Sequence, residues 1–156
     1  KGVRQVLETG AIAGYPLQDV RVTVYDGKHH SVDSKEVAFV AAGKKAFQDA
    51  VQKARPLVLE PIVNMRLEVP ADNIGDITGD LSGMRGRVNG TDTLANGRVR
   101  VEGQVPLAEV TAYQSRFKSV TGGEGSYVME FSHYEPVPAK TQQDLTAAYK
   151  PQEEED

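Results

Sequence analysis

The chain has 156 residues, of which 39% are hydrophobic, and its formal net charge is −4. It contains no cysteine, which excludes disulfides, thiolate catalysis and cysteine-ligated metals, and no apolar run approaches the ~20 residues of a membrane span. The charge is uneven, because residues 1–58 hold nine Lys or Arg against six Asp or Glu, whereas residues 59–156 hold nine against sixteen. Length and charge together indicate two small domains, the first of them basic.

The first predicted elements are a short helix and a strand. Apolar residues within Val3–Leu7 have helical spacing, and Gly10 is suited to the end of that helix. Across Asp19–Val24 valine alternates with polar residues, which is the two-residue period of a half-buried strand.

A turn then joins this strand to a long amphipathic helix. Asp26 and Gly27 turn the chain, and Asp33 with Glu36 forms a capping box for a helix that extends over residues 34–54. We expect the apolar side of this helix to lie against a sheet. That side holds Phe39, Ala42, Gly43, Ala46, Phe47, Ala50 and Ala54.

The turn presents Lys28, His29 and His30 on a connection that is anchored at both ends. On composition alone, the simplest interpretation is a solvated turn. The two histidines and Asp33 could be considered as metal ligands, but His29 and His30 are expected to point in different directions, and no third nearby ligand has helical or hairpin spacing. We therefore expect no metal site at this turn.

The remaining sequence predicts the order strand, helix, strand, strand, helix, strand. Apolar residues recur every three or four positions in the helices and every two positions in the strands. Asn96 and Gly97 form a tight-turn signal between the two middle strands. The predicted elements are strand 58–69, helix 71–84, strand 86–90, strand 97–105, helix 106–120 and strand 126–137. This order is typical of a split βαβ, ferredoxin-like sandwich.

The sequence contains no recognisable catalytic or phosphate-binding motif. The glycine-rich run 121–126 precedes a strand, so no helix N-terminus faces an anion there, and a flexible connection is the simpler interpretation. The chain has no Gly-x-x-x-x-Gly-Lys-Ser/Thr motif and no nucleophile beside a base. We expect neither catalytic residues nor enzyme activity in this chain.

Charged and aromatic residues of the second half have structural interpretations. The basic concentration of this half consists of Arg85, Arg87, Arg98 and Arg100. A cluster at one end of a hairpin and ordinary solvated strand faces are both compatible with it. Asp76 and Asp80 lie four apart on one helix and are expected to be solvated. His133 and Tyr134 are expected to pack with satisfied polar groups.

A collinear series of segments spans residues 1–138. Pro16–Glu60 holds a strand, a His-containing tip loop and a helix in succession. Leu81–Val88, Val105–Glu109 and Tyr127–Val137 follow in order. The first segment resembles the fourth domain of bacterial elongation factor G, the translocation GTPase, and the later segments resemble its fifth domain.

The resemblance implies two domains and an extension. Residues 1–58 would be the second half of domain IV, a ribosome-entering arm with its tip loop, and residues 59–138 would be domain V. Residues 139–156 would be a C-terminal extension whose acidic tail, after Pro151, is expected to be disordered. The implied fold is α+β, with an incomplete ribosomal-protein-S5-like β/α domain followed by a ferredoxin-like βαββαβ sandwich. Further strands of domain IV and the nucleotide-binding domain are expected upstream.

The resemblance also implies partners and cofactors. The expected partner is the ribosome, through ribosomal RNA of the decoding region and the GTPase-associated region, together with tRNA and mRNA, and not a membrane. No cofactor is expected in this chain, whereas GTP and Mg²⁺ are expected in the upstream domain of the parent protein. The parent is expected to be a monomeric cytoplasmic GTPase.

The tip histidine that enters the decoding site in the family matches His30, whose imidazole can contact RNA while Lys28 supplies charge. The residues expected to contact the ribosome at the tip are Lys28, His29, His30, Ser31 and Asp33. A secondary contact is expected at Lys118, Ser119, Thr121, Gly123 and Glu124.

The sequence departs from the family at both places. His29 and Ser31 stand where family members carry a tyrosine and an acid, and Gly122 and Glu124 replace Gln and Arg in a loop that typically reads Thr-Gln-Gly-Arg-Gly. Promotion of GTP-dependent translocation of tRNA and mRNA is therefore one hypothesis. The alternatives are a paralogue that acts in ribosome recycling or protection, or a ferredoxin-like interaction module without a ribosomal role.

Overall fold

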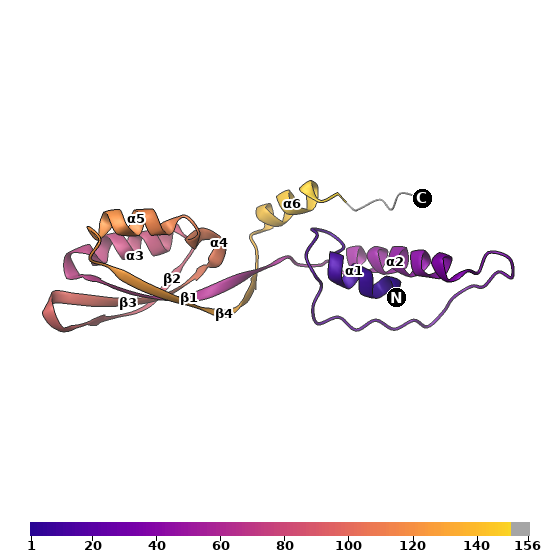
Figure 1. The fold of residues 1–156 in the computed structure, drawn as a ribbon, viewed down its shortest axis with the longest axis horizontal. Helices are drawn as coiled ribbons and strands as arrows, with labels where there is room; N and C mark the ends of the chain where they lie inside the picture. Colours follow the sequence, from indigo (N-terminus) through magenta and orange to yellow (C-terminus); the bar gives the residue numbers. More distant parts are fainter. Residues whose placement is uncertain (151–156) are drawn as a thin grey trace. The chain divides into compact units, whose positions relative to one another are not determined.

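The computed structural model describes residues 1–150. Its residues group into two units, of which one contains residues 1–58 with the described residues from 137 onward, and the other is Leu59–Pro136 (Figure 1). The acidic tail predicted after Pro151 lies outside the described residues. No helix within residues 1–150 is long and apolar enough to cross a membrane.

The Leu59–Pro136 unit is built on a four-stranded antiparallel sheet. Its strands are β1 Leu59–Pro70, β2 Arg87–Thr93, β3 Arg98–Pro106 and β4 Ser126–Pro136. They lie in the order β2-β3-β1-β4, and each neighbouring pair is antiparallel. Asn96 and Gly97 both have positive φ in the turn that joins β2 to β3, as the tight-turn signal predicts. The predicted ferredoxin-like order is confirmed.

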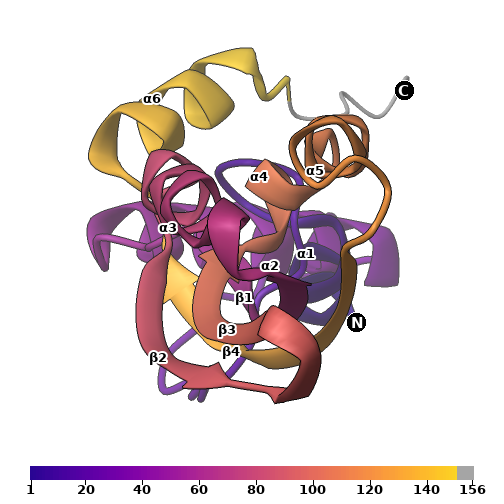
Figure 2. The same ribbon diagram turned by 90° about the vertical axis from the view of Figure 1, so that its left-hand side faces the viewer.

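The helices of this unit cover one face of the sheet. They are the α-helices α3 Ile74–Gly83, α4 Leu107–Val110 and α5 Tyr113–Val120, with the 3₁₀ turn η1 Ala71–Asn73 directly before α3. A second 3₁₀ turn, η2 Ala95–Gly97, lies in the connection between β2 and β3. Figure 2 shows α3 and α5 on the same side of the curved sheet. The single helix predicted over 106–120 is divided at residues 111–112, and Val110, Tyr113 and Phe117 are buried on the two sides of the break.

The core lies between this helix layer and the central strands. Alternate residues of β1 and β3 point into it, and residues spaced three or four apart on α3 and α5 meet them. The fully buried members are Met65, Leu67, Val69, Ile77, Leu81, Val101 and Val105. The strand and helix periods in the sequence therefore predict the core of this unit correctly.

The other unit consists of α1 Gly2–Thr9, α2 Glu36–Lys53 and α6 Ala139–Ala148. Val6 of α1 packs with Phe47 and Val51 of α2 in a small buried cluster. Gly2 lies so close to the Val40 carbonyl that any Cβ there would collide with it, so the approach of the two helices requires glycine at this position.

The strand predicted over Asp19–Val24 does not form. The backbone of this segment has no regular secondary structure, and Val20, Val22 and Val24 are all exposed. A strand needs a neighbour to accept and donate its backbone hydrogen bonds, and no other segment of residues 1–150 lies in that role. The valines alternate as in a strand, but no neighbouring strand is present to pair with this segment and bury them.

The predicted contact face of α2 is covered only at Phe47, and not by a sheet. Phe39, Ala42, Ala46 and Ala50 are exposed, whereas Phe47 and Val51 are buried. The described partner of α2 is a helix, α1, and not a sheet, so the narrower stripe that includes Phe47 and Val51 is covered.

Helix α6 lies within the predicted extension and was not predicted from the sequence. The Gln142 side chain links it to the segment before β1, because its Nε2 donates to the Pro56 carbonyl at 3.0 Å and its Oε1 accepts from the Val58 N–H at 3.0 Å. The Val137 N–H also donates to the Val58 carbonyl at 2.9 Å. The sequence of α6 shows no strong apolar stripe, and no residue of this helix is buried.

Candidate functional site

The tip predicted from the sequence lies in the long connection between α1 and α2. Figure 1 shows this connection as a long excursion that turns back to reach the first residue of α2. Near its start it is held to α1 by the Leu17 N–H, which donates to the Leu7 carbonyl at 2.8 Å. The tip is therefore anchored by α2 on one side as predicted, whereas on the other side the predicted strand is absent and the exposed residues 18–24 separate the tip from the Leu17 bond.

Ser34 closes the turn at the tip. Its hydroxyl accepts the His30 N–H at 2.7 Å and donates to the His30 carbonyl, and the Ser34 N–H donates to that carbonyl at 3.1 Å. These three bonds set the backbone of residues 30–34 without using any of the side chains before Ser34. Asp26 makes a second local bond, by accepting the Gly27 N–H at 2.7 Å.

The capping box predicted for Asp33 and Glu36 does not form. The N-cap of α2 is Lys35, which makes no side-chain cap bond. The Glu36 carboxylate lies 2.5 Å from the Lys1 Nζ, an ion pair that draws it away from the helix start. Ser34, which the sequence analysis placed inside the helix, terminates the preceding turn instead.

The His30 ring has one occupied and one open nitrogen. Its Nδ1 accepts a long hydrogen bond from the Val32 N–H at 3.4 Å and lies 3.4 Å from the Asp33 Oδ2. A neutral ring that accepts at Nδ1 carries its proton on Nε2, and so it presents a donor to solvent. Both side chains are largely exposed, so these contacts orient the ring only weakly.

The other predicted tip side chains are open to solvent. Lys28, His29 and Ser31 are exposed and have no side-chain partner among residues 1–150. Tyr25 is 94% exposed, and it is not among the tip residues predicted from the sequence. An aromatic residue directly before the Asp-Gly turn was the available signal, because a ring at a protruding turn can stack on a base. No group of three or more His, Asp or Glu within the described chain could hold a metal ion.

The second predicted contact, at the end of α5, is a tightly bonded connection. The Gly123 N–H donates to the Lys118 carbonyl at 3.0 Å, and the Glu124 N–H donates to the Thr121 carbonyl at 3.0 Å. Thr121 is buried, and its hydroxyl donates to the Phe117 carbonyl at 2.8 Å. Backbone donors and Thr121 are therefore used internally, which leaves the exposed side chains of Lys118, Ser119 and Glu124 for a partner.

The four arginines that the sequence groups together, Arg85, Arg87, Arg98 and Arg100, do not form a basic cluster. Arg85 and Arg87 pair with acids near one end of the sheet, whereas Arg98 and Arg100 are bonded near the other, because β2 and β3 run antiparallel. Their acceptors are Glu60 and Glu109 for Arg85, Glu135 for Arg87, the Glu68 and Glu124 carbonyls for Arg98, and Glu68 for Arg100. No free cationic patch results from them.

Asp80 was expected to be solvated, and this prediction is wrong. Its Oδ1 lies 2.7 Å from the Arg116 Nη2, and its side chain is almost fully buried between α3 and α5. Burial, and secondarily the Asp80 charge, raises the pKa of the neighbouring Tyr113 hydroxyl above its ordinary value. The spacing of the two acids gave no sign of this pair, because Arg116 is 36 residues away in sequence.

His133 bridges two polar side chains on β4. Its Nδ1 lies 2.8 Å from the Ser132 hydroxyl and its Nε2 lies 2.8 Å from the Glu135 carboxylate. The hydrogen bond to His133, and secondarily the charge of Arg87, lowers the pKa of Glu135 below its ordinary value. His133 thus has a satisfied polar group as predicted, whereas Tyr134 is half exposed.

Replacing His133 by alanine is expected to raise the pKa of Glu135 toward its ordinary value, because the largest cause of the lowering is removed. Carboxyl ¹³C NMR titration would measure this, with the exposed Glu130 as the internal control. A lowered pKa adds stability above the unfolded-state value and loses it as the pH falls through the folded value. The variant should therefore lose less stability on acidification, and an unchanged Glu135 titration would contradict the assigned cause.

Comparisons with known proteins follow the same division of the chain. Residues 1–55 match the family model described as Elongation factor G, domain IV, and residues 57–145 match Elongation factor G C-terminus. Over 138 residues the chain is 46% identical to Elongation factor G of Aquifex pyrophilus, which covers 88% of this chain and 20% of that protein. A crystal structure from Thermus thermophilus aligns with a TM-score of 0.76 and 36% identity, covering 93% of this chain and 22% of that one. The chain thus spans about a fifth of the length of these relatives.

Proposed function

We propose that this chain, which belongs to the elongation factor G family, is the ribosome-contacting C-terminal part of a translational GTPase. The observation that carries the proposal is the exposed tip between Tyr25 and Ser31, where Ser34 closes the turn of residues 30–34 and the side chains of Lys28 and His29 have no partner among residues 1–150. A preformed tip loses little conformational freedom when it binds. The domain that carries the tip is basic as a whole, since residues 1–58 hold nine Lys or Arg against six Asp or Glu.

The tip side chains supply three kinds of RNA contact. Lys28 can neutralise a phosphate, the free Nε2 of His30 can donate to a phosphate or base edge, and Tyr25 can stack on a base. Asp33 lies beside His30, and His29 and Ser31 flank it. The tip would thus act by position and charge, without chemistry of its own.

The wider role follows from the family. The parent protein would bind GTP and Mg²⁺ in an upstream domain and act in the cytoplasm as a monomer. Hydrolysis of this GTP would drive residues 1–58, as the second half of domain IV, toward the decoding region. There the tip would help to move tRNA and mRNA. Residues 59–138, as domain V, would face the GTPase-associated region, and residues 139–156 would form the extension.

A specialised paralogue is the second candidate. Glu124 is exposed and its carboxylate has no partner among residues 1–150, whereas the family typically carries Arg in this loop. An anion there opposes contact with a phosphate, because affinity for RNA rests heavily on phosphate neutralisation. This difference favours ribosome contacts unlike those of a translocase, and therefore a role in recycling or protection.

Changing Lys28 and His30 together to alanine is expected to weaken binding of the full-length protein to ribosomes about tenfold, with a flatter salt dependence because one phosphate contact is lost. Co-sedimentation with ribosomes and a non-hydrolysable GTP analogue, over a range of salt concentrations, would measure both effects. Both side chains are exposed, so the variant should fold normally.

The matched control removes a lysine and a polar side chain from α2, by changing Lys45 and Gln52 to alanine. Both are exposed but lie away from the tip. Equal pelleting of the tip variant and the natural protein would remove the tip from the ribosome contact. Equal losses in the tip variant and the control would show that general charge, and not the tip, governs binding.

A further inference from the structure

The two edges of the sheet differ in the side chains that they expose. Edge strand β2 carries one exposed large apolar residue, Val88, and its pairing with β3 shifts register between Val88 and Gly90. Edge strand β4 exposes four, with Val128 58%, Met129 47%, Phe131 59% and Tyr134 50% exposed. Proteins usually protect a free edge with charge, proline or a bulge, and most of β4 lacks these features.

The free edge of β4 is a continuous run of six residues. From Ser126 to Phe131 it pairs in unbroken register with β1, and no strand of the Leu59–Pro136 unit lies on its other side. The register shifts after Phe131, where Ser132 is extra. This bulge places the Phe131 and Tyr134 rings together, with centroids 5.2 Å apart, and it marks one end of the run.

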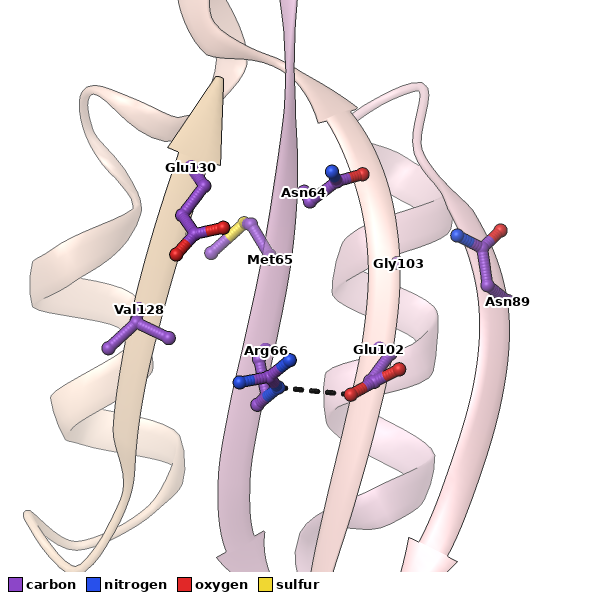
Figure 3. A pocket seen from close by; sticks show the side chains of 8 residues that line it. All are labelled: Asn64, Met65, Arg66, Asn89, Glu102, Gly103, Val128 and Glu130. Atoms are coloured by element: carbon purple, nitrogen blue, oxygen red, sulfur yellow. Dashed lines mark hydrogen bonds and ion pairs between the residues drawn. The ribbon is translucent and has the colours of Figure 1, made fainter. Parts of the chain in front are cut away.

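Side chains on the two faces of this run offer different chemistry. Met129 and Phe131 share the face of the buried Met65 and Val63, with which they pair in register. On the opposite face, Val128 and Glu130 border a hollow of about 220 Å³ whose floor includes Asn64 and Arg66 (Figure 3).

The charge that remains unpaired beside this edge is negative. Arg66 is paired with Glu102 at 3.0 Å, and Arg100 with Glu68 at 2.8 Å. The Glu130 carboxylate is exposed and has no partner among residues 1–150. A cation that reached the hollow from the edge would therefore meet Glu130 without displacing an existing pair.

We propose that Ser126–Phe131 of β4 is a docking edge for an extended segment of a protein partner. That segment adds a strand to the sheet, places apolar residues on Met129 and Phe131, and directs a Lys or Arg at Glu130. A six-residue edge buries less surface than a standard interface, so the complex is weak and transient.

Charge decides against two other occupants. The charged residues of β4 are Glu130 and Glu135, with no Lys or Arg, so β4 of a second copy would offer no cation to Glu130. RNA is also disfavoured, because the free charge at this edge repels phosphates.

The test uses the whole chain, ¹⁵N-labelled, and the synthetic peptide Thr-Val-Lys-Val-Thr-Val, whose valines share one face and whose lysine lies on the other. Titration followed by NMR is expected to shift the amide signals of Ser126–Phe131. A matched peptide with Glu in place of Lys should bind about fivefold more weakly. Glu130→Gln should abolish that difference, whereas Phe131→Ser should weaken both peptides.

The control variant is Val88→Ser, which changes an exposed residue on the opposite edge and should leave both affinities unchanged. All three substitutions are at exposed positions, and the dispersion of the amide spectrum shows whether each variant is folded. Shifts on β2, equal affinity for the two peptides, or no shift on β4 would each overturn the proposal. Concentration-dependent shifts of β4 signals without peptide would also overturn it, by assigning the edge to a second copy.

Discussion

Replacing Leu81 by alanine is expected to lower the free energy of unfolding of the Leu59–Pro136 unit by about 3 kcal/mol. Leu81 on α3 has 0% exposed surface, and it lies against β3 at Gly103, where a side chain would contact its Cδ1. Truncation removes buried apolar surface and leaves a cavity. The surrounding side chains cannot move in to fill it, because the sheet and the helices α3 and α5 hold them in place. Urea denaturation followed by circular dichroism would measure the change.

The matched control is Leu107→Ala on α4, where the same side chain is partly exposed. Its loss should cost less than about 1 kcal/mol, because most of the removed surface creates no enclosed cavity. Similar losses for the two variants would show that the helix layer is loosely packed. The unfolding midpoint must be assigned to this unit, and amide signals from β1 and β3 would follow it separately from those of α1 and α2.

Removing the Arg85 side chain, by Arg85→Met, is expected to cost about 2 kcal/mol of stability. Two nitrogens of Arg85 bind the two carboxylate oxygens of Glu60 at 2.7 and 2.9 Å, and a third lies 2.9 Å from Glu109. These hydrogen bonds, that to Glu60 above all, raise the pKa of Arg85. The Glu60 side chain is only 11% exposed, so it would be left as a largely buried anion, although the 38% exposure of Arg85 lets water limit the cost.

A double variant separates this charge effect from lost packing. Adding Glu60→Gln to Arg85→Met removes the stranded charge, so part of the stability should return, as measured by urea denaturation. Arg66→Met provides the control, because the Arg66–Glu102 pair is exposed on both sides and should contribute less than about 1 kcal/mol. A double variant less stable than Arg85→Met alone would show that lost packing, and not the charge of Glu60, governs the effect.

Local patterns predict the second unit well, because its elements find their partners within the chain. The two-residue period of Val99, Val101 and Val105 and the helical spacing of Ile77 and Leu81 mark the residues that are buried. A period shows which side chains share a face, and the order of elements leaves few ways to stack those faces. The predicted ferredoxin-like sheet follows from these two constraints.

The same patterns mislead where the partner is not local. Val20 and Val22 alternate like strand residues, yet they remain exposed because no strand of the described chain accepts their backbone hydrogen bonds. Phe39 and Phe47 both lie on the predicted apolar side of α2, but α1 covers only Phe47. Capping shows the same limit, since Asp33 has the right type and spacing while Ser34 closes the turn and Glu36 pairs with Lys1.

The sequence by itself determined the elements of the Leu59–Pro136 unit, their order and the family resemblance, because each depends on residues close together along the chain. The tertiary structure decided which faces are covered and which charges are paired. Asp80 meets Arg116, and Arg85 meets Glu60, only after folding brings distant elements together. Burial and ion pairing depend on the whole three-dimensional neighbourhood of a side chain, and no local period encodes that neighbourhood.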